Sequence, residues 1–401
     1  MKDIITNAKR LYRLKLNQTL PDYKCYLFDP LHNSPAKLTA IYGCRGIGKT
    51  TLLMQLLQAS PLPKESTLYI SCDHPMLQDV SLFDFVEAFS QLGGALICID
   101  EVQEAKDFEQ ALKSIYDFLD IKVYFTGSSA IQLVNPDLSR RYFMHHLAPL
   151  SFREMLEITQ QVALPVYPLD ALFEHHEQIA HEVIDRLADK KILKHFQQFL
   201  SVGAYPFYFE DPSKYVDRIN ETINLVLHQD LAKIFQIQPD KIDNLKKLLL
   251  TLCVTKPLEL SMDKLASTVG ITKATLYKYI RYLDDAELIR HITHEGKRFA
   301  AMRKSDKLYL AHPNLFEALC LNQNLGTLRE TFFVSALLSS YRLHYVDQGD
   351  FLVNETYQVE IGGKNKGFEQ LNGIENSYVV SDDIEVGFER CIPLWLFGFL
   401  R

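Results

Sequence analysis

Between residues 38 and 150, short apolar runs alternate with longer stretches that have one apolar face. The apolar runs predict strands, at Leu38–Tyr42, Thr67–Ser71, Ala95–Ile99, Lys122–Thr126 and Arg141–His146. The intervening stretches, 50–59, 81–92 and 105–119, have the 3.6-residue periodicity of amphipathic helices. This alternation predicts an α/β fold with a mostly parallel sheet covered by helices on both faces. Phosphates bind such sheets at the carboxyl ends of the strands.

The rest of the chain has a different pattern and predicts four further segments. Residues 1–36 form a basic N-terminal arm, either a solvated helix face or a partner-binding arm, with cations at Lys9, Arg10, Arg13 and Lys15. Residues 37–150 contain the parallel sheet. Residues 151–240 are helix-rich and suit a lid or adaptor. Residues 241–304 suit a winged helix-turn-helix, and 305–401 a small α/β domain.

Composition narrows the class of protein. A chain of 401 residues, 47% apolar and 23% charged, is long enough for several globular domains. Its net charge of −7 gives no global basic field, so any nucleic-acid site must be a local patch. Seven scattered cysteines without a C-x-x-C pair predict reduced thiols in a cytoplasmic protein, with neither a disulfide framework nor a zinc site. Neither a signal peptide nor a membrane partner is expected, since no apolar run reaches 18 residues.

The residues after the first predicted strand carry the clearest chemistry. Gly43–Thr50 fits G-x-x-x-x-G-K-[ST] between an apolar strand and a helical stretch. Its glycines let backbone N–H groups point at phosphates, Lys49 supplies a positive charge, and the Thr50 hydroxyl is a ligand for Mg²⁺. A plain glycine-rich turn is the weaker alternative. The expected ATP-binding residues are Gly43, Cys44, Arg45, Gly46, Ile47, Gly48, Lys49, Thr50 and Thr51.

A second motif follows about fifty residues later, where the apolar strand Leu96–Ile99 ends in Asp100 and Glu101. Such a pair of carboxylates after a buried strand is the Walker B arrangement. Asp100 is expected to hold Mg²⁺, and Glu101 to polarise the attacking water. The alternative is that both acids begin a helix, where they favour its dipole. Together the two motifs predict ATP hydrolysis with Mg²⁺ as the cofactor.

Two further positions suggest how the site is completed. Thr126 and Ser128 follow the fourth predicted strand, where a hydroxyl either contacts the γ-phosphate or the lytic water, or caps the next helix. Arg141 is a candidate for stabilising charge on the transferred phosphate, from its own chain or from another subunit. The alternative is a surface pair of arginines with Arg140. An arginine that acts on another subunit would require self-association, whereas one that acts within its own chain would not.

The runs GCRGIGKTTLL, LICIDEVQ, YFTGSSAIQL and LSRRYFMHHLAPLSFREML resemble a widespread prokaryotic family of predicted AAA-like P-loop ATPases. The resemblance extends over nearly the whole chain. It implies a P-loop core, a helical lid, a winged helix and a restriction-endonuclease-like domain. In that family the arginine before the strand that precedes PLSFRE is the candidate finger, and Arg141 matches it. This chain has Arg140 where the family often has glycine, so either Arg140 or Arg141 can correspond to the family's arginine.

Residues 241–304 have their own support for a helix-turn-helix. Helices are predicted at 241–252, 261–269 and 272–285, with a turn at Gly270 and a wing at 289–300. Residues 256–304 hold ten Lys or Arg against six Asp or Glu, a local charge of +4. The candidate DNA contacts on the last helix are Lys273, Tyr277, Lys278 and Arg281. Winged helices also dock proteins, so a protein partner is the alternative.

The C-terminal segment matches the metal-binding residues of the endonuclease-like domain only in part. Glu330, Asp350 and Glu360 match the carboxylates that the resemblance implies. Gly362 replaces the lysine of E-x-K, and the nearest amine is Lys364. A degenerate binding fold is therefore predicted, with an active nuclease as the alternative. The chain is thus expected to be an ATPase that gates DNA binding; an ATP-dependent nuclease and a protein-docking scaffold or signalling ATPase are the alternatives.

Overall fold

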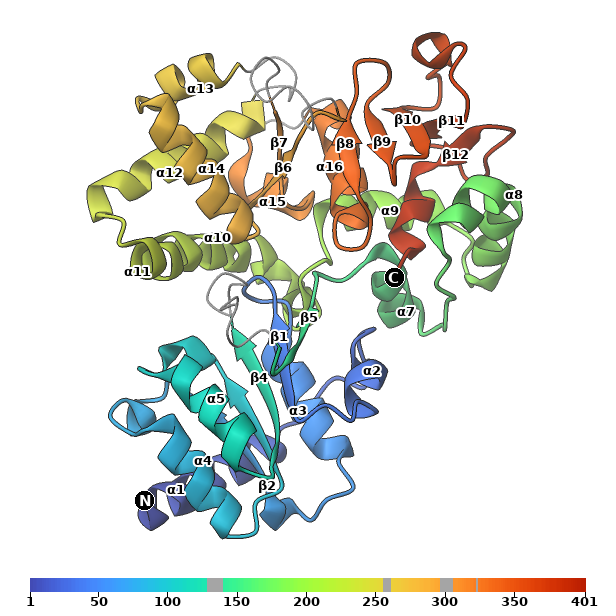
Figure 1. The fold of residues 1–401 in the computed structure, drawn as a ribbon. Helices are drawn as coiled ribbons and strands as arrows, with labels where there is room; N and C mark the ends of the chain where they lie inside the picture. Colours follow the sequence, from blue (N-terminus) through green and yellow to red (C-terminus); the bar gives the residue numbers. More distant parts are fainter. Residues whose placement is uncertain (128–139, 255–260, 296–305, 322–323) are drawn as a thin grey trace. The chain divides into compact units, whose positions relative to one another are not determined.

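The computed structural model describes residues 1–127, 140–254, 261–295, 306–321 and 324–401. These form two compact units, 1–148 and 149–401 (Figure 1). Ser128 lies outside the described residues, as does the part of the expected wing from 296 onward.

The first unit is built on a five-stranded parallel sheet, which confirms the predicted α/β class. Its strands are β1 (Leu38–Tyr42), β2 (Thr67–Ser71), β3 (Leu96–Asp100), β4 (Lys122–Gly127) and β5 (Phe143–His146). They lie in the order β2-β3-β4-β1-β5. The P-loop follows β1 and the two acids end β3, so both motifs reach the same edge of the sheet.

Helices cover both faces of this sheet, and their bounds are α1 (Lys2–Leu16), α2 (Phe28–His32), α3 (Lys49–Ala59), α4 (Leu82–Gln91) and α5 (Phe108–Phe118). Within the unit, α3 lies on one face and α4 and α5 on the other (Figure 1). The N-terminal segment belongs to this unit, because α1 packs against β2 and the hydroxyls of Tyr12 and Thr67 hydrogen-bond at 2.9 Å.

The second unit begins with helices and ends in a mixed sheet. Its helices are α7 (Phe152–Gln160), α8 (Leu169–Arg186), α9 (Ile192–Ser201), α10 (Tyr215–Leu225), α11 (Ala232–Phe235), α12 (Pro239–Val254), α13 (Met262–Val269), α14 (Lys273–Asp285), α15 (Asn314–Leu319) and α16 (Leu325–Leu337). Antiparallel strands β6 (Ile289–Ile292) and β7 (Lys307–Leu310) follow α14.

The larger sheet of this unit has the order β12-β11-β10-β9-β8. Its strands are β8 (Leu343–Tyr345), β9 (Phe351–Val353), β10 (Tyr357–Gly362), β11 (Ser377–Ser381) and β12 (Cys391–Pro393). Neighbours β10, β11 and β12 are parallel, whereas β8, β9 and β10 are antiparallel. Helix α16 packs against β10.

The ends of the second unit meet in one core. Ser151 and Glu154 form a capping box at the start of α7. Beside it, Arg153 Nε donates to the main-chain oxygen of Arg401 at 2.8 Å, and Phe152 packs edge-on against Phe399. Residues 151–240, 241–304 and 305–401, which the sequence separates into three segments, therefore fold together as one compact unit.

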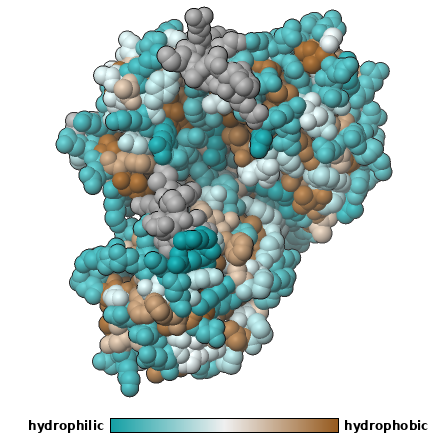
Figure 2. All heavy atoms as spheres, in the orientation of Figure 1, coloured by the Kyte–Doolittle hydropathy of each residue, from teal (hydrophilic) through white to brown (hydrophobic). Residues whose placement is uncertain are grey.

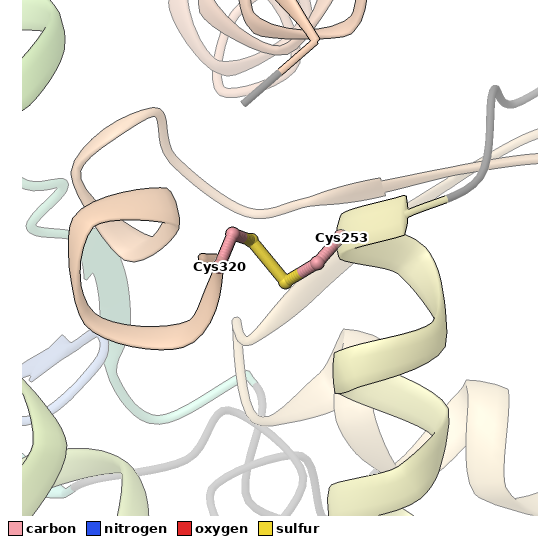
Figure 3. The surroundings of a disulfide bond; sticks show 2 residues. All are labelled: Cys253 and Cys320. Carbon is pink, nitrogen blue, oxygen red and sulfur yellow. A yellow bond between two sulfur atoms is a disulfide. The ribbon is translucent and has the colours of Figure 1, made fainter. Parts of the chain in front are cut away.

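The structure corrects the expectation that all cysteines are thiols. Cys253, near the end of α12, forms a disulfide with Cys320, directly after α15 (Figure 3). Their Cα atoms lie 5.3 Å apart although 67 residues separate them in sequence. No short motif signals a pairing over that distance, because helix packing alone brings the two sulfurs together.

The surface of the described residues is as polar as the composition of the chain predicts. On the face drawn in Figure 2 it is mostly hydrophilic, with scattered hydrophobic residues. Across the described parts of the chain, no helix combines the length and the apolar character needed to cross a membrane.

Candidate functional site

The loop between β1 and α3 requires glycine for both steric and conformational reasons. A Cβ atom on Gly43 would lie 2.2 Å from the main-chain oxygen of Leu147. Gly48, the N-cap of α3, has a φ of 93°, in the left-handed region that L side chains rarely adopt. The loop therefore approaches its neighbours closely and turns directly into the amino end of a helix, where anions bind favourably.

Lys49 is folded into this loop. Its side chain is buried, with 6% of the residue exposed. The ammonium donates to the main-chain oxygens of Gly43 and Cys44, both at 2.8 Å. These contacts fix a positive charge inside the loop, in reach of the backbone that would hold phosphates.

Thr50 and Asp100 come together across the edge of the sheet. The Thr50 hydroxyl donates to Asp100 Oδ2 at 2.6 Å, and the Tyr69 hydroxyl donates to the same oxygen at 2.7 Å. Thr126, the described one of the two candidate sensors, donates to Asp100 Oδ1. Three hydroxyls thus orient one carboxylate, and the Thr50 and Asp100 oxygens are the hard ligands that Mg²⁺ prefers.

Tyr69 brings a residue from the N-terminal helix to this site. Lys15 Nζ donates to the Tyr69 hydroxyl at 2.7 Å and lies 3.9 Å from the centre of its ring. Burial lowers the pKa of Lys15, and Asp100 partly opposes that shift. A pocket of about 630 Å³ lies here, with Thr50, Asp100 and Glu101 in its wall. The sequence places Lys15 only in the basic N-terminal arm and does not indicate Tyr69 at all, because neither residue is part of a contiguous motif of this site.

Glu101 is held in an unusual backbone conformation. Its φ is 49°, left-handed for a residue other than glycine, as is common where function fixes a side chain. Its N–H donates to Thr126 Oγ1 at 3.1 Å, and the Gln103 amide donates to its carboxylate. Burial raises the pKa of Glu101, with Lys49 opposing the shift. A carboxylate with a raised pKa is better matched to accept a proton from water.

Arg141 lies at the other edge of the same sheet. It lies two residues before β5, which runs parallel to β1, so it lies near the amino ends of the strands. The P-loop follows the carboxyl end of β1. Arg141 Nε pairs with Asp117 Oδ1 at 3.2 Å, and Arg140 is exposed. The strand direction therefore places Arg141 away from the phosphate loop of its own chain.

The candidate DNA-binding residues lie on α14, which follows α13 after a sharp turn. Gly270 ends α13 with a φ of 82°, and Thr272 caps α14 by accepting from the Thr275 N–H at 3.2 Å. Lys273 pairs with an aspartate of α13, and Arg281 with one at the end of its own helix.

The exposed residues of α14 divide between two sides. Tyr277 and Lys278 are both exposed. Lys278 also borders a pocket of about 680 Å³ between α14 and the α11–α12 turn. Tyr282, which lines the same pocket, stacks on Phe235 with ring centres 3.6 Å apart. The candidate residues are therefore not all on one open face.

The three C-terminal carboxylates converge, but Lys364 does not join them. Glu330 and Asp350 approach the same lysine, Lys307 of β7, and Glu360 pairs with Lys366. Lys364 is exposed. Burial, and then the charge of Asp350, raises the pKa of Glu330 to about 7. In the described residues, no group of three or more His, Cys, Asp or Glu is arranged to hold a metal ion.

Comparison with known proteins identifies the class of the first unit. Residues 35–156 match the family model described as an AAA domain, and residues 193–327 match a domain of unknown function, DUF8612. With the loop and the paired acids already described, the first unit contains a P-loop ATPase-like domain of the AAA class.

Individual proteins show more distant likenesses. The uncharacterized protein MJ1637 of Methanocaldococcus jannaschii is 29% identical over 392 residues, covering 89% of this chain and 83% of that protein. The Walker-type ATPase PABY2304 of Pyrococcus abyssi has 15% identity and a TM-score of 0.40, covering 73% of this chain and 93% of that one. AMPPCP-bound DnaA of Aquifex aeolicus has 15% identity and a TM-score of 0.25, with coverages of 69% and 88%. TM-scores of this size do not establish a shared fold.

Proposed function

We propose that the first unit binds ATP and hydrolyses it with Mg²⁺. The observation that carries this proposal is the contact between the Thr50 hydroxyl and Asp100 at 2.6 Å, beside the buried Lys49 ammonium. It brings a phosphate-binding charge and two metal-ligand oxygens to one edge of the sheet. Without Asp100 and Glu101 on that edge, the loop would support phosphate binding and nothing further.

In this mechanism each group has one task. The loop N–H groups and Lys49 bind the β- and γ-phosphates, and Thr50 and Asp100 would hold the metal. Bound Mg²⁺ would neutralise charge that develops on the phosphate oxygens. Glu101 orients the attacking water in line with the γ-phosphate and accepts its proton, and Thr126 keeps the Glu101 backbone in place through the 3.1 Å hydrogen bond.

Removal of the metal tests this proposal. Purified protein with ATP and Mg²⁺ is expected to release inorganic phosphate, and an excess of EDTA is expected to reduce that release to background. Continuous phosphate detection measures both, and restoring Mg²⁺ in excess of the EDTA is the control for reversibility. Phosphate release that persists undiminished in EDTA would reject hydrolysis at this site.

The position of Arg141 favours a second copy of the chain as the source of the finger. Because Arg141 lies at the amino ends of the strands, it can reach a γ-phosphate more directly on a neighbouring subunit than on its own. Two exposed aromatic residues lie next to this ion pair in the sequence. Phe143, two residues after Arg141, is 67% exposed, and Phe118, directly after Asp117, is 78% exposed. Apolar side chains exposed beside a charged group are common where subunits meet.

For the output of the ATPase we propose nucleotide-gated DNA binding through α12–α14 and the β6–β7 pair, the elements that fall in the expected winged helix. The supporting observation is that the basic residues Lys278 and Arg281 of α14 are both exposed. The side chain of Arg281 is largely exposed, so solvent weakens its ion pair with Asp285 and phosphates can compete for the guanidinium. ATP can favour the DNA-bound state only as far as it binds that state more tightly.

Charge reversal on α14 tests this output. The variant Lys278→Glu/Arg281→Glu is expected to bind duplex DNA at least about tenfold more weakly than the wild type at the same salt. Fluorescence anisotropy with ATP, with ADP and without nucleotide measures both affinity and gating. Lys190→Glu, which reverses the charge of an exposed lysine after α8, is the matched control. If all variants bind DNA with equal affinity and without salt dependence, DNA binding through α14 is rejected. The scaffold alternative, in which these elements bind a protein, would then be favoured.

A further inference from the structure

Lys307 is a buried lysine among the C-terminal carboxylates. It opens β7, and only 1% of the residue is exposed. Its ammonium lies 3.6 Å from Asp350 Oδ1 and 3.9 Å from Glu330 Oε2. The ring of Phe351 adds a cation–π contact, with its centre 5.0 Å from Nζ. Burial of an ammonium is strongly unfavourable unless such partners surround it.

The carboxylates around Lys307 are fixed by other donors. The Tyr309 hydroxyl donates to Glu330 Oε2 at 2.6 Å, and the Ile361 N–H donates to Asp350 Oδ2 at 2.8 Å. The Ile361 N–H therefore occupies one oxygen of Asp350, and the other oxygen, Oδ1, faces the Lys307 ammonium. The carboxylates come from α16, from the residue before β9 and from β10, so the whole arrangement depends on tertiary packing.

Glu360 completes the cluster with an oxygen that has no hydrogen-bond donor. The residue is 3% exposed, and its Oε1 pairs with Lys366. Its Oε2 is buried and accepts no hydrogen bond from any residue that the structure describes. A buried carboxylate oxygen in this state is costly, and the usual partner of such an oxygen is a cation.

The charges of the cluster nearly cancel. Three carboxylates face two ammonium groups, Lys307 and Lys366, which leaves one formal negative charge. Hard divalent cations are held by two or more carboxylates whose charge is not already neutralised. With Lys307 between Glu330 and Asp350, both the space and the charge for such a cation are taken.

We propose that Lys307 occupies the cation position of a divalent-metal site formed by Glu330, Asp350 and Glu360. The wild-type cluster binds no divalent ion, and it becomes a site for Mn²⁺ or Mg²⁺ when the lysine charge is removed. Lys307 thus serves as a tethered cation that joins β7 to the C-terminal sheet. This inference concerns the second unit alone and does not depend on ATP hydrolysis by the first.

Manganese titration of nucleotide-free protein tests the proposal. Lys307→Met keeps an unbranched side chain that is one atom shorter, so it removes the ammonium with its charge, and it is expected to gain about one Mn²⁺ per chain by calorimetry. Adding Asp350→Asn to that variant should abolish the gained binding. Lys364→Met removes an exposed lysine of the same domain and should leave Mn²⁺ binding as in the wild type.

Two results would overturn the proposal. One is Mn²⁺ binding to the wild type that Asp350→Asn removes, since the site would then be open with Lys307 in place. The other is a folded Lys307→Met protein that gains no Mn²⁺. If Lys307→Met does not fold, Lys307→Gln keeps a hydrogen-bond donor at this position and carries the same comparison. In either case, titration of the wild type tests by itself whether the cluster excludes Mn²⁺ while Lys307 is in place.

Discussion

Lys49→Ala is expected to abolish detectable ATP binding. Lys49 is the lysine of the loop, and its buried ammonium is held beside the backbone that would contact phosphate. Losing one partner of a buried, hydrogen-bonded charge pair costs about 3 kcal/mol or more, which corresponds to more than a hundredfold in Kd. Titration with a fluorescent ATP analogue, or calorimetry with ATP, measures the change directly.

Lys113→Ala is the matched control for this variant. Lys113 is an exposed lysine of α5 in the same unit, and its removal should leave ATP affinity unchanged. Circular dichroism and thermal unfolding establish whether Lys49→Ala remains folded, since the lysine also holds the oxygens of Gly43 and Cys44. A folded Lys49→Ala protein with wild-type affinity would exclude this loop as the phosphate site.

The parts of the nucleotide site that lie in contiguous motifs could be predicted from the sequence. Gly43–Thr50 and Asp100–Glu101 each follow an apolar strand, and parallel strands deliver their carboxyl ends to one edge. The contact between Thr50 and Asp100 then follows from topology. Tyr69 and Lys15 belong to no contiguous motif: the pairing of β2 with β3 brings Tyr69 to Asp100, and the packing of α1 on β2 brings Lys15 to Tyr69.

The C-terminal cluster shows the same division. The family resemblance implies a shared site for Glu330, Asp350 and Glu360, and the structure brings the three carboxylates into one region around two lysines. The nearest lysine in sequence is not one of them. Lys307 lies 23 positions before Glu330, so only the pairing of β7 and its packing against α16 places it there. Strand pairing over such separations is not encoded in any local pattern.

The direction of β5 shows where Arg141 lies relative to the phosphate loop of its own chain. Sequence alone allows Arg141 to act within its own chain or on a neighbour. Since β5 is parallel to β1, Arg141, two residues before β5, and the loop after β1 lie at opposite ends of the strands. A parallel pairing is a long-range feature, and the short run Arg141–His146 gives no sign of its direction or its partner strand.

Glu101→Gln is expected to bind ATP with nearly wild-type affinity and to lose most of its turnover. The amide has the shape of the carboxylate and still offers an oxygen to the Gln103 donor, but it cannot accept a proton from water. Loss of a general base typically costs about 10²- to 10⁴-fold in rate. Because burial raises the pKa of Glu101 and the ionised form acts as the base, wild-type turnover should rise with pH through that pKa.

Steady-state phosphate release and ATP titration of the same preparation separate these two effects. Glu104→Gln, an exposed acid three residues away, is the control and should hydrolyse ATP as the wild type does. The ATP-bound Glu101→Gln protein can also be sized by light scattering, because it holds the nucleotide without consuming it. If Arg141 completes the site of a neighbour, that complex should be larger than the nucleotide-free protein. Turnover of Glu101→Gln at the wild-type rate would assign the activation of water to another group.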